Sequence, residues 1–186
     1  MYIHQITPYS VVNGPFERTV IHFQGCTLSC PGCFNTSTHP MKDGMSLSVK
    51  DLLVQIPSGQ EHITISGGEP FLQAKELLEL VQVLRTKGFG IVLFSGFYLN
   101  EIKKIPEAEK VLEFIDVLID GRFEEENVAQ NGIRGSSNQT LHFLTDKYTP
   151  EQMTNRQFEI QFNKDGGIIM TGFPDPIWEE ALGMEK

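Results

Sequence analysis

Segments typical of β-strands and of α-helices alternate along the first 121 residues, and this alternation constrains the fold more than any other feature of the sequence. The expected strands are residues 19–25, 62–66, 90–95 and 116–121, and the expected helices are residues 48–56, 75–87 and 107–115. Strands that alternate with helices pair in parallel through right-handed crossovers, and the helices cover the sheet. The sequence therefore predicts an α/β fold.

Polar, glycine and cysteine residues follow the expected strands at the point where each strand ends. Cys26 follows the first strand, Gly67 and Gly68 follow the second, Ser95 ends the third and Asp120 ends the fourth. Functional sites in parallel α/β folds lie at the carboxyl ends of the strands. We therefore expect these residues to share one site.

The pattern is weaker after residue 121. Residues 124–138 are polar and predict a long loop, and residues 140–144 predict a strand. Residues 158–162 alternate cleanly between apolar and polar side chains. A turn-forming segment at 163–166 joins them to a second hydrophobic run at 167–170, which predicts a β-hairpin.

These patterns suggest a core domain at residues 1–145 and a C-terminal extension at 146–186 whose hairpin packs on the core. The residues from Phe173 onward resemble a loosely attached tail. The extension has three conceivable roles: it covers an open side of the core, contacts a partner, or completes the sheet. Completion is the simplest, because short chains gain core by adding strands.

Length, charge and hydrophobicity limit the class of protein. The chain has 186 residues, of which 40% are hydrophobic, and this is enough for one sizeable core. A formal net charge of -9 argues against binding to nucleic acid or anionic lipid. No apolar run approaches the roughly 20 residues that span a bilayer, and the first residues lack the basic region of a secretory signal. We expect a cytoplasmic protein that binds neither nucleic acid nor membrane.

The three cysteines of the chain, Cys26, Cys30 and Cys33, lie close together. Such a cluster cannot serve as the disulfide framework of a chain of this length, so it indicates a metal or redox centre. Thiolates bind iron-sulfur clusters and zinc. A four-iron cluster held by three cysteines leaves one iron open to another ligand, whereas zinc would need His39 or His22 as a fourth ligand. The cysteines alone leave both kinds of site open.

A second motif, Gly67-Gly68-Glu69-Pro70, follows the strand at 62–66. The two glycines allow close backbone approach, Glu69 supplies an acceptor, and Pro70 fixes the direction of the chain. Alone, this motif is typical of a structural turn between a strand and a helix.

The two motifs together resemble those of the radical S-adenosylmethionine superfamily. The spacing Cys26-x-x-x-Cys30-x-x-Cys33, followed by the aromatic Phe34, resembles its cluster-binding signature. Gly67-Gly68-Glu69-Pro70 resembles its motif for the amino group of S-adenosylmethionine. The resemblance implies that the three cysteines are the metal ligands and catalytic residues, holding a 4Fe-4S cluster whose open iron binds S-adenosylmethionine.

Within that superfamily, residues 2–144 resemble the family of anaerobic ribonucleoside-triphosphate reductase-activating proteins. The matching segments are His4-Gln5, Val12-Asn13-Gly14-Pro15 with Arg18, Gly25 to Asn35, Ser37-Thr38, Ser66 to Pro70, Ser95-Gly96-Phe97, Val117 to Phe123, and Arg134 to Gln139. The resemblance implies a shortened parallel (βα) partial barrel of the radical S-adenosylmethionine type, whose open side receives a loop of a partner protein. The cofactor-binding residues that it implies are Phe34, Asn35, Gly67, Gly68, Glu69, Pro70, Ser95 and Asp120.

The activity implied by this resemblance is that of a radical-generating activating enzyme. Reductive cleavage of S-adenosylmethionine gives a 5′-deoxyadenosyl radical, which generates a glycyl radical on a partner, expected to be anaerobic ribonucleoside-triphosphate reductase. A reduced flavodoxin or ferredoxin is the implied electron donor. The alternatives are a radical enzyme that modifies a small molecule, a peptide or an RNA base, and a non-catalytic iron-sulfur or zinc-binding module.

Three features depart from the usual pattern of the family. Phe34 stands where tyrosine is frequent, Phe16 replaces a glycine often found after Asn-Gly-Pro, and the residues from about 145 onward extend beyond a typical member. The segment from Arg134 to Gln139 is rich in groups that suit a hydrogen-bonded loop, and it receives no individual role in the site.

Overall fold

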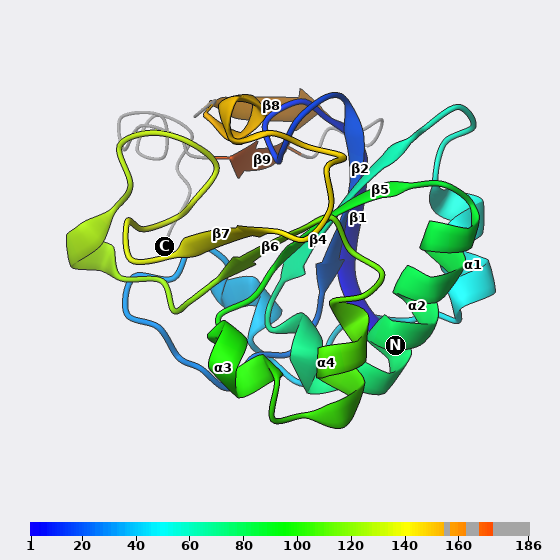
Figure 1. The fold of residues 1–186 in the computed structure, drawn as a ribbon, viewed down its shortest axis with the longest axis horizontal. Helices are drawn as coiled ribbons and strands as arrows, with labels where there is room; N and C mark the ends of the chain where they lie inside the picture. The colour runs from blue at the N-terminus through cyan, green and yellow to red at the C-terminus, as the bar shows by residue number, and fades with distance from the viewer. Residues whose placement is uncertain (155–156, 163–167, 173–186) are drawn as a thin grey trace.

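The computed structural model describes residues 1–154, 157–162 and 168–172. Its main sheet has the strand order β3-β1-β2-β4-β5-β6-β7 (Figure 1). The strands are β1 (Tyr2–Ser10), β2 (Arg18–Phe23), β3 (Met45–Ser46), β4 (His62–Gly67), β5 (Gly90–Phe94), β6 (Val117–Asp120) and β7 (Thr140–Phe143). At the centre, β2, β4, β5 and β6 pair in parallel, as the alternation of elements predicts. The α/β class is confirmed, whereas closure of the sheet into a partial barrel remains a prediction.

Antiparallel strands flank the parallel centre of the sheet. On one side β1 pairs with β2 and with β3, and on the other side β7 pairs with β6. The strand expected at residues 140–144 is therefore confirmed. The sequence patterns do not identify β1, because its register with β2 shifts between Ile3 and Gln5 and again between Thr7 and Ser10. Such irregularities remove the strict period of two by which a strand is recognised.

The helices expected from the sequence are present and pack on one face of the sheet. The α-helices are α1 (Val49–Gln55), α2 (Ala74–Thr86), α3 (Leu99–Ile102) and α4 (Pro106–Val111). The Ser48 side chain accepts a hydrogen bond from the amide of Asp51, whose own side chain accepts one from Ser48, and this capping box starts α1. Leu77 and Leu80 of α2 are buried in the main hydrophobic core with Ile65 of β4.

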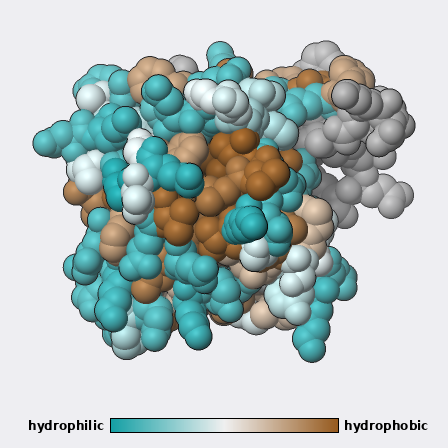
Figure 2. Space-filling view, turned by 90° about the vertical axis from the view of Figure 1, so that its right-hand side faces the viewer, coloured by the Kyte–Doolittle hydropathy of each residue, from teal (hydrophilic) through white to brown (hydrophobic). Residues whose placement is uncertain are grey.

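Figure 2 looks onto the side of the molecule where α1 and α2 lie, and it shows hydrophobic side chains gathered near the centre of this face. Val54 of α1, with 79% of its surface exposed, is the most exposed large hydrophobic residue in the described part of the chain. None of the helices in that part is both long enough and apolar enough to cross a membrane.

The predicted hairpin is confirmed as β8 (Phe158–Phe162) paired antiparallel with β9 (Ile168–Gly172). Its predicted turn at 163–166 and the predicted tail from Phe173 lie outside the described residues. The amide of Val11 donates to the Glu159 carboxylate at 3.2 Å, and Asn13 Nδ2 donates to Thr171 Oγ1 at 2.9 Å. Val11 and Asn13 belong to the connection that precedes β2, and the cysteines follow β2. The hairpin therefore lies at the end of the parallel strands opposite the cysteines (Figure 1).

The segment between β7 and the hairpin is packed against the face of the sheet that the α-helices leave open. Tyr148 and Met153 are buried there with Val92 and Val117. The Tyr148 hydroxyl lies 2.8 Å from His62 Nδ1 at the amino-terminal end of β4. A Cβ atom on Gly90 would come within 2.3 Å of this hydroxyl oxygen, so a larger residue where β5 begins would displace the Tyr148 side chain.

Candidate functional site

Backbone hydrogen bonds join the cysteine loop to the glycine turn at the carboxyl edge of the sheet. The amide of Gly68 donates to the carbonyl of Phe23 at 2.9 Å, and the amide of Glu69 donates to the carbonyl of Gly25 at 2.8 Å. A Cβ atom on Gly68 would stand 2.3 Å from the Gly25 oxygen, so this approach is open only to glycine. The two motifs that the sequence places about 40 residues apart therefore meet directly.

The three cysteines are unpaired and half-buried on this loop. Burial raises the pKa of Cys26, and the charges of Glu69, Cys33 and Cys30 raise it further. Burial also raises the pKa of Cys33, to which the charge of Cys30 adds. Both shifts favour the neutral thiol, so bound metal would be needed to hold Cys26 and Cys33 as thiolates.

One histidine lies beside the cysteine loop. Within the described residues, no three His, Cys, Asp or Glu side chains lie close enough to share one metal ion. His39 Nε2 lies 3.4 Å from Cys33 Sγ, but it does not complete such a group. Three thiols on one loop are donors of the kind that an iron-sulfur cluster takes.

Glu69 is fully buried, and its carboxylate links the carboxyl ends of β4 and β5. It accepts hydrogen bonds from the amide of Phe71 at 2.9 Å, from the amide of Gly96 at 2.7 Å and from the Ser95 hydroxyl at 3.0 Å. Burial raises the pKa of Glu69 to about 7, although these donors act in the opposite direction. Pro70 is also buried and begins the short 3-10 helix η2 (Pro70–Gln73). Glu69 and Ser95, both predicted site residues, are thus in direct contact.

Asp120 lies on the face of β6 that the helices cover. Its neighbour Leu118 belongs to the helix-side core, and side chains two residues apart on a strand share a face. The Asp120 carboxylate accepts a hydrogen bond from the amide of Leu99 at 2.5 Å, at the start of α3, and lies 3.1 Å from His142 Nε2. The contacts of Asp120 are therefore with α3 and β7.

Phe34 and Asn35 follow the last cysteine. The ring of Phe34 is exposed and packs against Phe123, with ring centroids 4.7 Å apart. The carbonyl of Asn35 accepts hydrogen bonds from the amide of Thr38 at 2.9 Å and from its hydroxyl at 2.6 Å, within the 3-10 helix η1 (Thr36–Thr38). The carbonyl of Thr38 in turn accepts from the amide of Gly25 at 2.7 Å, which closes the cysteine loop on itself.

The segment from Arg134 to Gln139 forms a loop bonded to the residues that follow β6. The Gln139 side chain accepts from the amide of Gly135 at 2.8 Å and donates to the carbonyl of Gly121 at 2.9 Å. Asn138 Nδ2 donates to the carbonyl of Arg122 at 2.8 Å. These polar side chains therefore fix the loop beside the carboxyl edge, which explains their number.

A row of half-buried residues crosses the sheet on the face opposite the helices. The motifs predict none of its residues as cofactor-binding, although His22 was a possible zinc ligand. Gln5 pairs with His22, and His22 pairs with Ser66. The signal in the sequence is the position of His22 between Ile21 and Phe23, which both face the helix-side core. Alternation on β2 then turns His22 to the other face, just below the cysteine loop.

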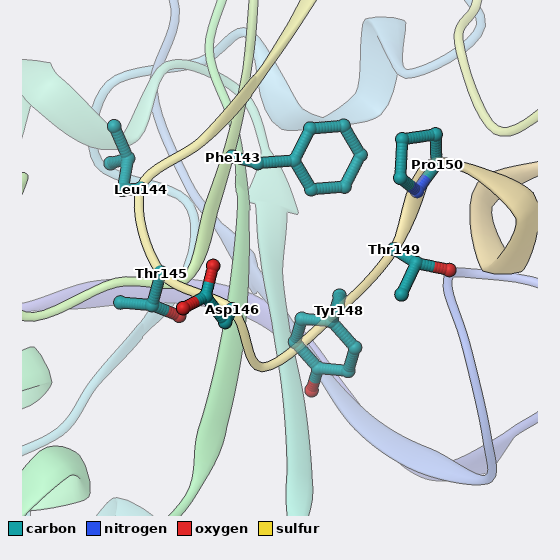
Figure 3. Close-up of a pocket in the computed structure, with 7 residues that line it drawn as sticks. All are labelled: Phe143, Leu144, Thr145, Asp146, Tyr148, Thr149 and Pro150. Carbon is teal, nitrogen blue, oxygen red and sulfur yellow. The ribbon is translucent and has the colours of Figure 1, made fainter.

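Two cavities lie away from the cysteines. One, of about 400 Å³, lies between β7 and the segment that follows it, and Phe143, Tyr148 and Pro150 are among its lining residues (Figure 3). The other, of about 300 Å³, is lined by Ile133, Leu141 and Phe143 among others. Neither cavity is lined by a predicted site residue. The candidate site is the cysteine loop together with the glycine turn that is hydrogen-bonded to it.

Comparison with known proteins identifies the family of the chain. Residues 12–142 match the family described as a 4Fe-4S single cluster domain. The chain is 33% identical over 155 residues to the anaerobic ribonucleoside-triphosphate reductase-activating protein of Escherichia coli (strain K12), an alignment that covers 77% of this chain and 99% of that protein. It is 35% identical over 161 residues to the protein of the same name from Vibrio cholerae, covering 78% and 99%. The crystal structure of QueE from Escherichia coli superposes with a TM-score of 0.43 at 23% identity, over 51% of this chain and 52% of that one.

Proposed function

This chain belongs to the family of anaerobic ribonucleoside-triphosphate reductase-activating proteins, and on that premise we propose that it reductively cleaves S-adenosylmethionine and generates a glycyl radical on a partner enzyme. It is an enzyme of the radical S-adenosylmethionine class. The partner that we propose is the anaerobic ribonucleoside-triphosphate reductase of the same organism. The proposed electron donor is a reduced flavodoxin or ferredoxin, and the proposed location is the cytoplasm.

Cys26, Cys30 and Cys33 would hold the 4Fe-4S cluster. When bound, the cluster supplies one electron to the sulfonium of S-adenosylmethionine, so that the C5′–S bond breaks to give methionine and the 5′-deoxyadenosyl radical. In the hydrogen transfer that follows, a glycine Cα–H bond of the partner breaks and a C5′–H bond forms. The protein's contribution is to bind and orient the reactants and to exclude competing reactions.

The observation that carries this proposal is the direct hydrogen bonding between the cysteine loop and the glycine turn. The bond from the Glu69 amide to the Gly25 carbonyl fixes the turn one residue before Cys26. A ligand held by backbone acceptors of residues 67–70 would therefore lie beside the cysteines. This is what a substrate needs if it is to bind both the turn and an open iron.

The remaining predicted residues take supporting parts in the proposal. Phe34, which is exposed at the end of the cysteine loop, would contact the adenine, and Asn35 shapes the loop through its carbonyl. Ser95 would act through Glu69, to which it is bonded. Asp120 would support the site through α3, because its carboxylate bonds the first amide of that helix. We also propose that residues 1–145 form the catalytic core and that 146–186 form an extension.

The test is anaerobic reconstitution with iron and sulfide, followed by dithionite and S-adenosylmethionine and measurement of 5′-deoxyadenosine. The wild-type protein should bind about four iron atoms per chain and form the product. Cys30→Ala should lose both properties. Thr27→Ala, which changes an exposed residue of the same loop, is the matched control and should keep both. Iron binding without 5′-deoxyadenosine, with or without the reductase, would mean that the protein is a cluster-binding module.

A further inference from the structure

His39 contacts both ends of the cysteine loop. Its carbonyl accepts a hydrogen bond from the amide of Cys26 at 3.1 Å, and its ring nitrogen Nε2 lies 3.4 Å from Cys33 Sγ. The residue is half-buried. The first and the last cysteine of the loop are therefore bonded to the same histidine, through its backbone and through its side chain.

Backbone hydrogen bonds fix the position of His39. The residue ends the 3-10 helix η1, and its amide donates to the carbonyl of Thr36 at 3.0 Å. The preceding residue, Thr38, is buried, and its carbonyl accepts from the amide of Gly25 at 2.7 Å. Because the backbone on both sides of the ring is already ordered, contact with the sulfur of Cys33 costs mainly the freedom of one side chain.

Ligation of iron by Cys33 would fix the direction of this hydrogen bond. In the metal-free protein either partner can carry the hydrogen, because a thiol is a weak donor and a neutral imidazole accepts at one nitrogen. A cysteine that ligates iron is a thiolate and has no proton to donate. The donor is then the Nε2–H group of His39, and the acceptor is the sulfur of Cys33.

The cysteine sulfurs also accept hydrogen bonds from the main chain. Burial raises the pKa of both Cys26 and Cys33, and a backbone hydrogen bond opposes this effect in each case, from Leu28 to Cys26 and from Asn35 to Cys33. These amides are retained whatever side chain residues 28 and 35 carry. The contribution of His39 depends on its imidazole, so it can be removed by substitution while the main-chain donors stay in place.

A donor to a cluster sulfur favours the reduced state of the cluster. Reduction adds negative charge that is shared with the sulfur ligands, and a hydrogen bond strengthens when its acceptor becomes more negative. Hydrogen bonds to the sulfurs are accordingly among the factors that set the reduction potential of iron-sulfur clusters. The proposed reaction begins with transfer of one electron from a reduced flavodoxin or ferredoxin, so this potential decides how readily that electron is accepted.

We propose that His39 donates a hydrogen bond from Nε2 to cluster-bound Cys33 and thereby raises the reduction potential of the cluster. His39 is a positioning residue: it acts through Cys33, does not ligate iron and does not touch S-adenosylmethionine. The inference rests on the proposed function only for the presence of the cluster, and it deepens that function by naming a residue that controls entry of the electron.

The test compares reconstituted wild-type protein with His39→Phe, which keeps a planar ring and removes both ring nitrogens. Iron and sulfide per chain are measured first. The midpoint potential is then measured by redox titration, without S-adenosylmethionine or partner, and electron paramagnetic resonance detects the reduced cluster. His39→Gln restores an N–H donor. Thr36→Ala changes an exposed residue of the same 3-10 helix and is the control.

His39→Phe should bind about four iron atoms per chain, like wild type. At the midpoint potential of wild type, its ratio of reduced to oxidised cluster should be about fivefold lower, which is a shift of about −40 mV at about 59 mV per factor of ten. His39→Gln should recover most of this shift, and Thr36→Ala should show none. A residue that only stabilised the loop would change the iron content and leave the midpoint of the loaded protein unchanged.

A second measurement uses wild-type protein in which histidine is labelled with ¹⁵N. Electron-nuclear double resonance on the reduced cluster should show a weak nitrogen coupling that is absent in His39→Phe, as expected for a nitrogen that is hydrogen-bonded to a ligand sulfur. A strong coupling would mean that the imidazole is bonded to iron. Either a strong coupling, or no coupling at all, would overturn the inference, as would an unchanged midpoint in His39→Phe.

The inference and the proposed function can fail separately. A shifted midpoint in His39→Phe, together with no 5′-deoxyadenosine from wild type, would contradict the proposed function and retain the role of His39. Formation of 5′-deoxyadenosine by wild type, together with an unchanged midpoint in the variant, would do the reverse. A wild-type protein that assembles no cluster would contradict both.

Discussion

The ring of Phe16 stacks on the ring of His62, with centroids 4.9 Å apart, while the backbone of Phe16 has a φ of 61°. The left-handed conformation costs a residue with a side chain about 1–2 kcal/mol. This cost explains why other members of the family often have a glycine at the position of Phe16. In this chain, stacking on His62, worth about 0.5–1.5 kcal/mol, offsets part of that cost.

Glycine should therefore be more stabilising than alanine at position 16, the reverse of their usual order. Both Phe16→Gly and Phe16→Ala lose the stacking, but only alanine keeps the backbone strain. We expect Phe16→Gly to be more stable than Phe16→Ala by roughly 1 kcal/mol in urea denaturation. Glu17, which has no positive φ, is the control, and there the alanine variant should be the more stable. The same order at both positions would contradict the strain argument.

The buried carboxyl of Glu69 should make the metal-free protein less stable as the pH rises. Its pKa is about 7 in the folded state, and the ordinary value is 4.5. A raised pKa means that folding favours the protonated form, so the stability from this group is complete below about pH 4.5 and is lost as the pH rises to about 7. The upper limit of the effect is roughly 3 kcal/mol.

The measurement is urea denaturation under reducing conditions from pH 5 to pH 8, for wild type and for Glu69→Gln. The variant does not titrate, so its stability should fall less over this range. Its absolute stability should be lower at pH 5, because an amide nitrogen cannot accept the hydrogen bonds that the carboxyl oxygens accept from Gly96 and Ser95. Parallel pH profiles would show that Glu69 does not titrate in this range.

A methyl group at Gly68 should disturb the cysteine loop. The new Cβ atom would meet the Gly25 carbonyl at 2.3 Å, and since this is backbone, the loop must move. We expect Gly68→Ala to cost about 1–3 kcal/mol of stability and to lower iron loading after reconstitution by at least about threefold. Gly59→Ala is the control. It has a φ of 86° but nothing within 4 Å, so it should lose stability through strain and still load iron like wild type.

The sequence predicted the parts of the fold that depend on local pattern. The segments at 62–66 and 90–95 are short runs that contain β-branched residues, and they form most of β4 and β5. The meeting of the cysteine loop with the glycine turn could also be predicted, because parallel strands end at the same edge. β1 could not be predicted, since two register shifts remove its alternation.

The environment of individual side chains in the site depends on contacts that no local pattern contains. Glu69 looked like an acceptor open to a ligand, but donors from Phe71, Ser95 and Gly96 surround it. The row of half-buried residues that includes His22 is defined by the register of neighbouring strands, which is set by the whole sheet. Sequence therefore indicated which residues gather at the edge, and the structure was needed to show which of them face an open surface.

Asp120 gives the sharpest distinction between support of the fold and contact with a ligand. Its carboxylate accepts from the amide of Leu99, so Asp120→Ala should lose about 1 kcal/mol of stability, as for loss of a helix cap. Asp120→Asn keeps an oxygen acceptor and should recover most of this loss. If the role is structural, the asparagine variant should also bind S-adenosylmethionine like wild type in equilibrium dialysis. If instead the carboxylate contacts the ligand, asparagine and alanine should weaken binding alike, because both remove its charge.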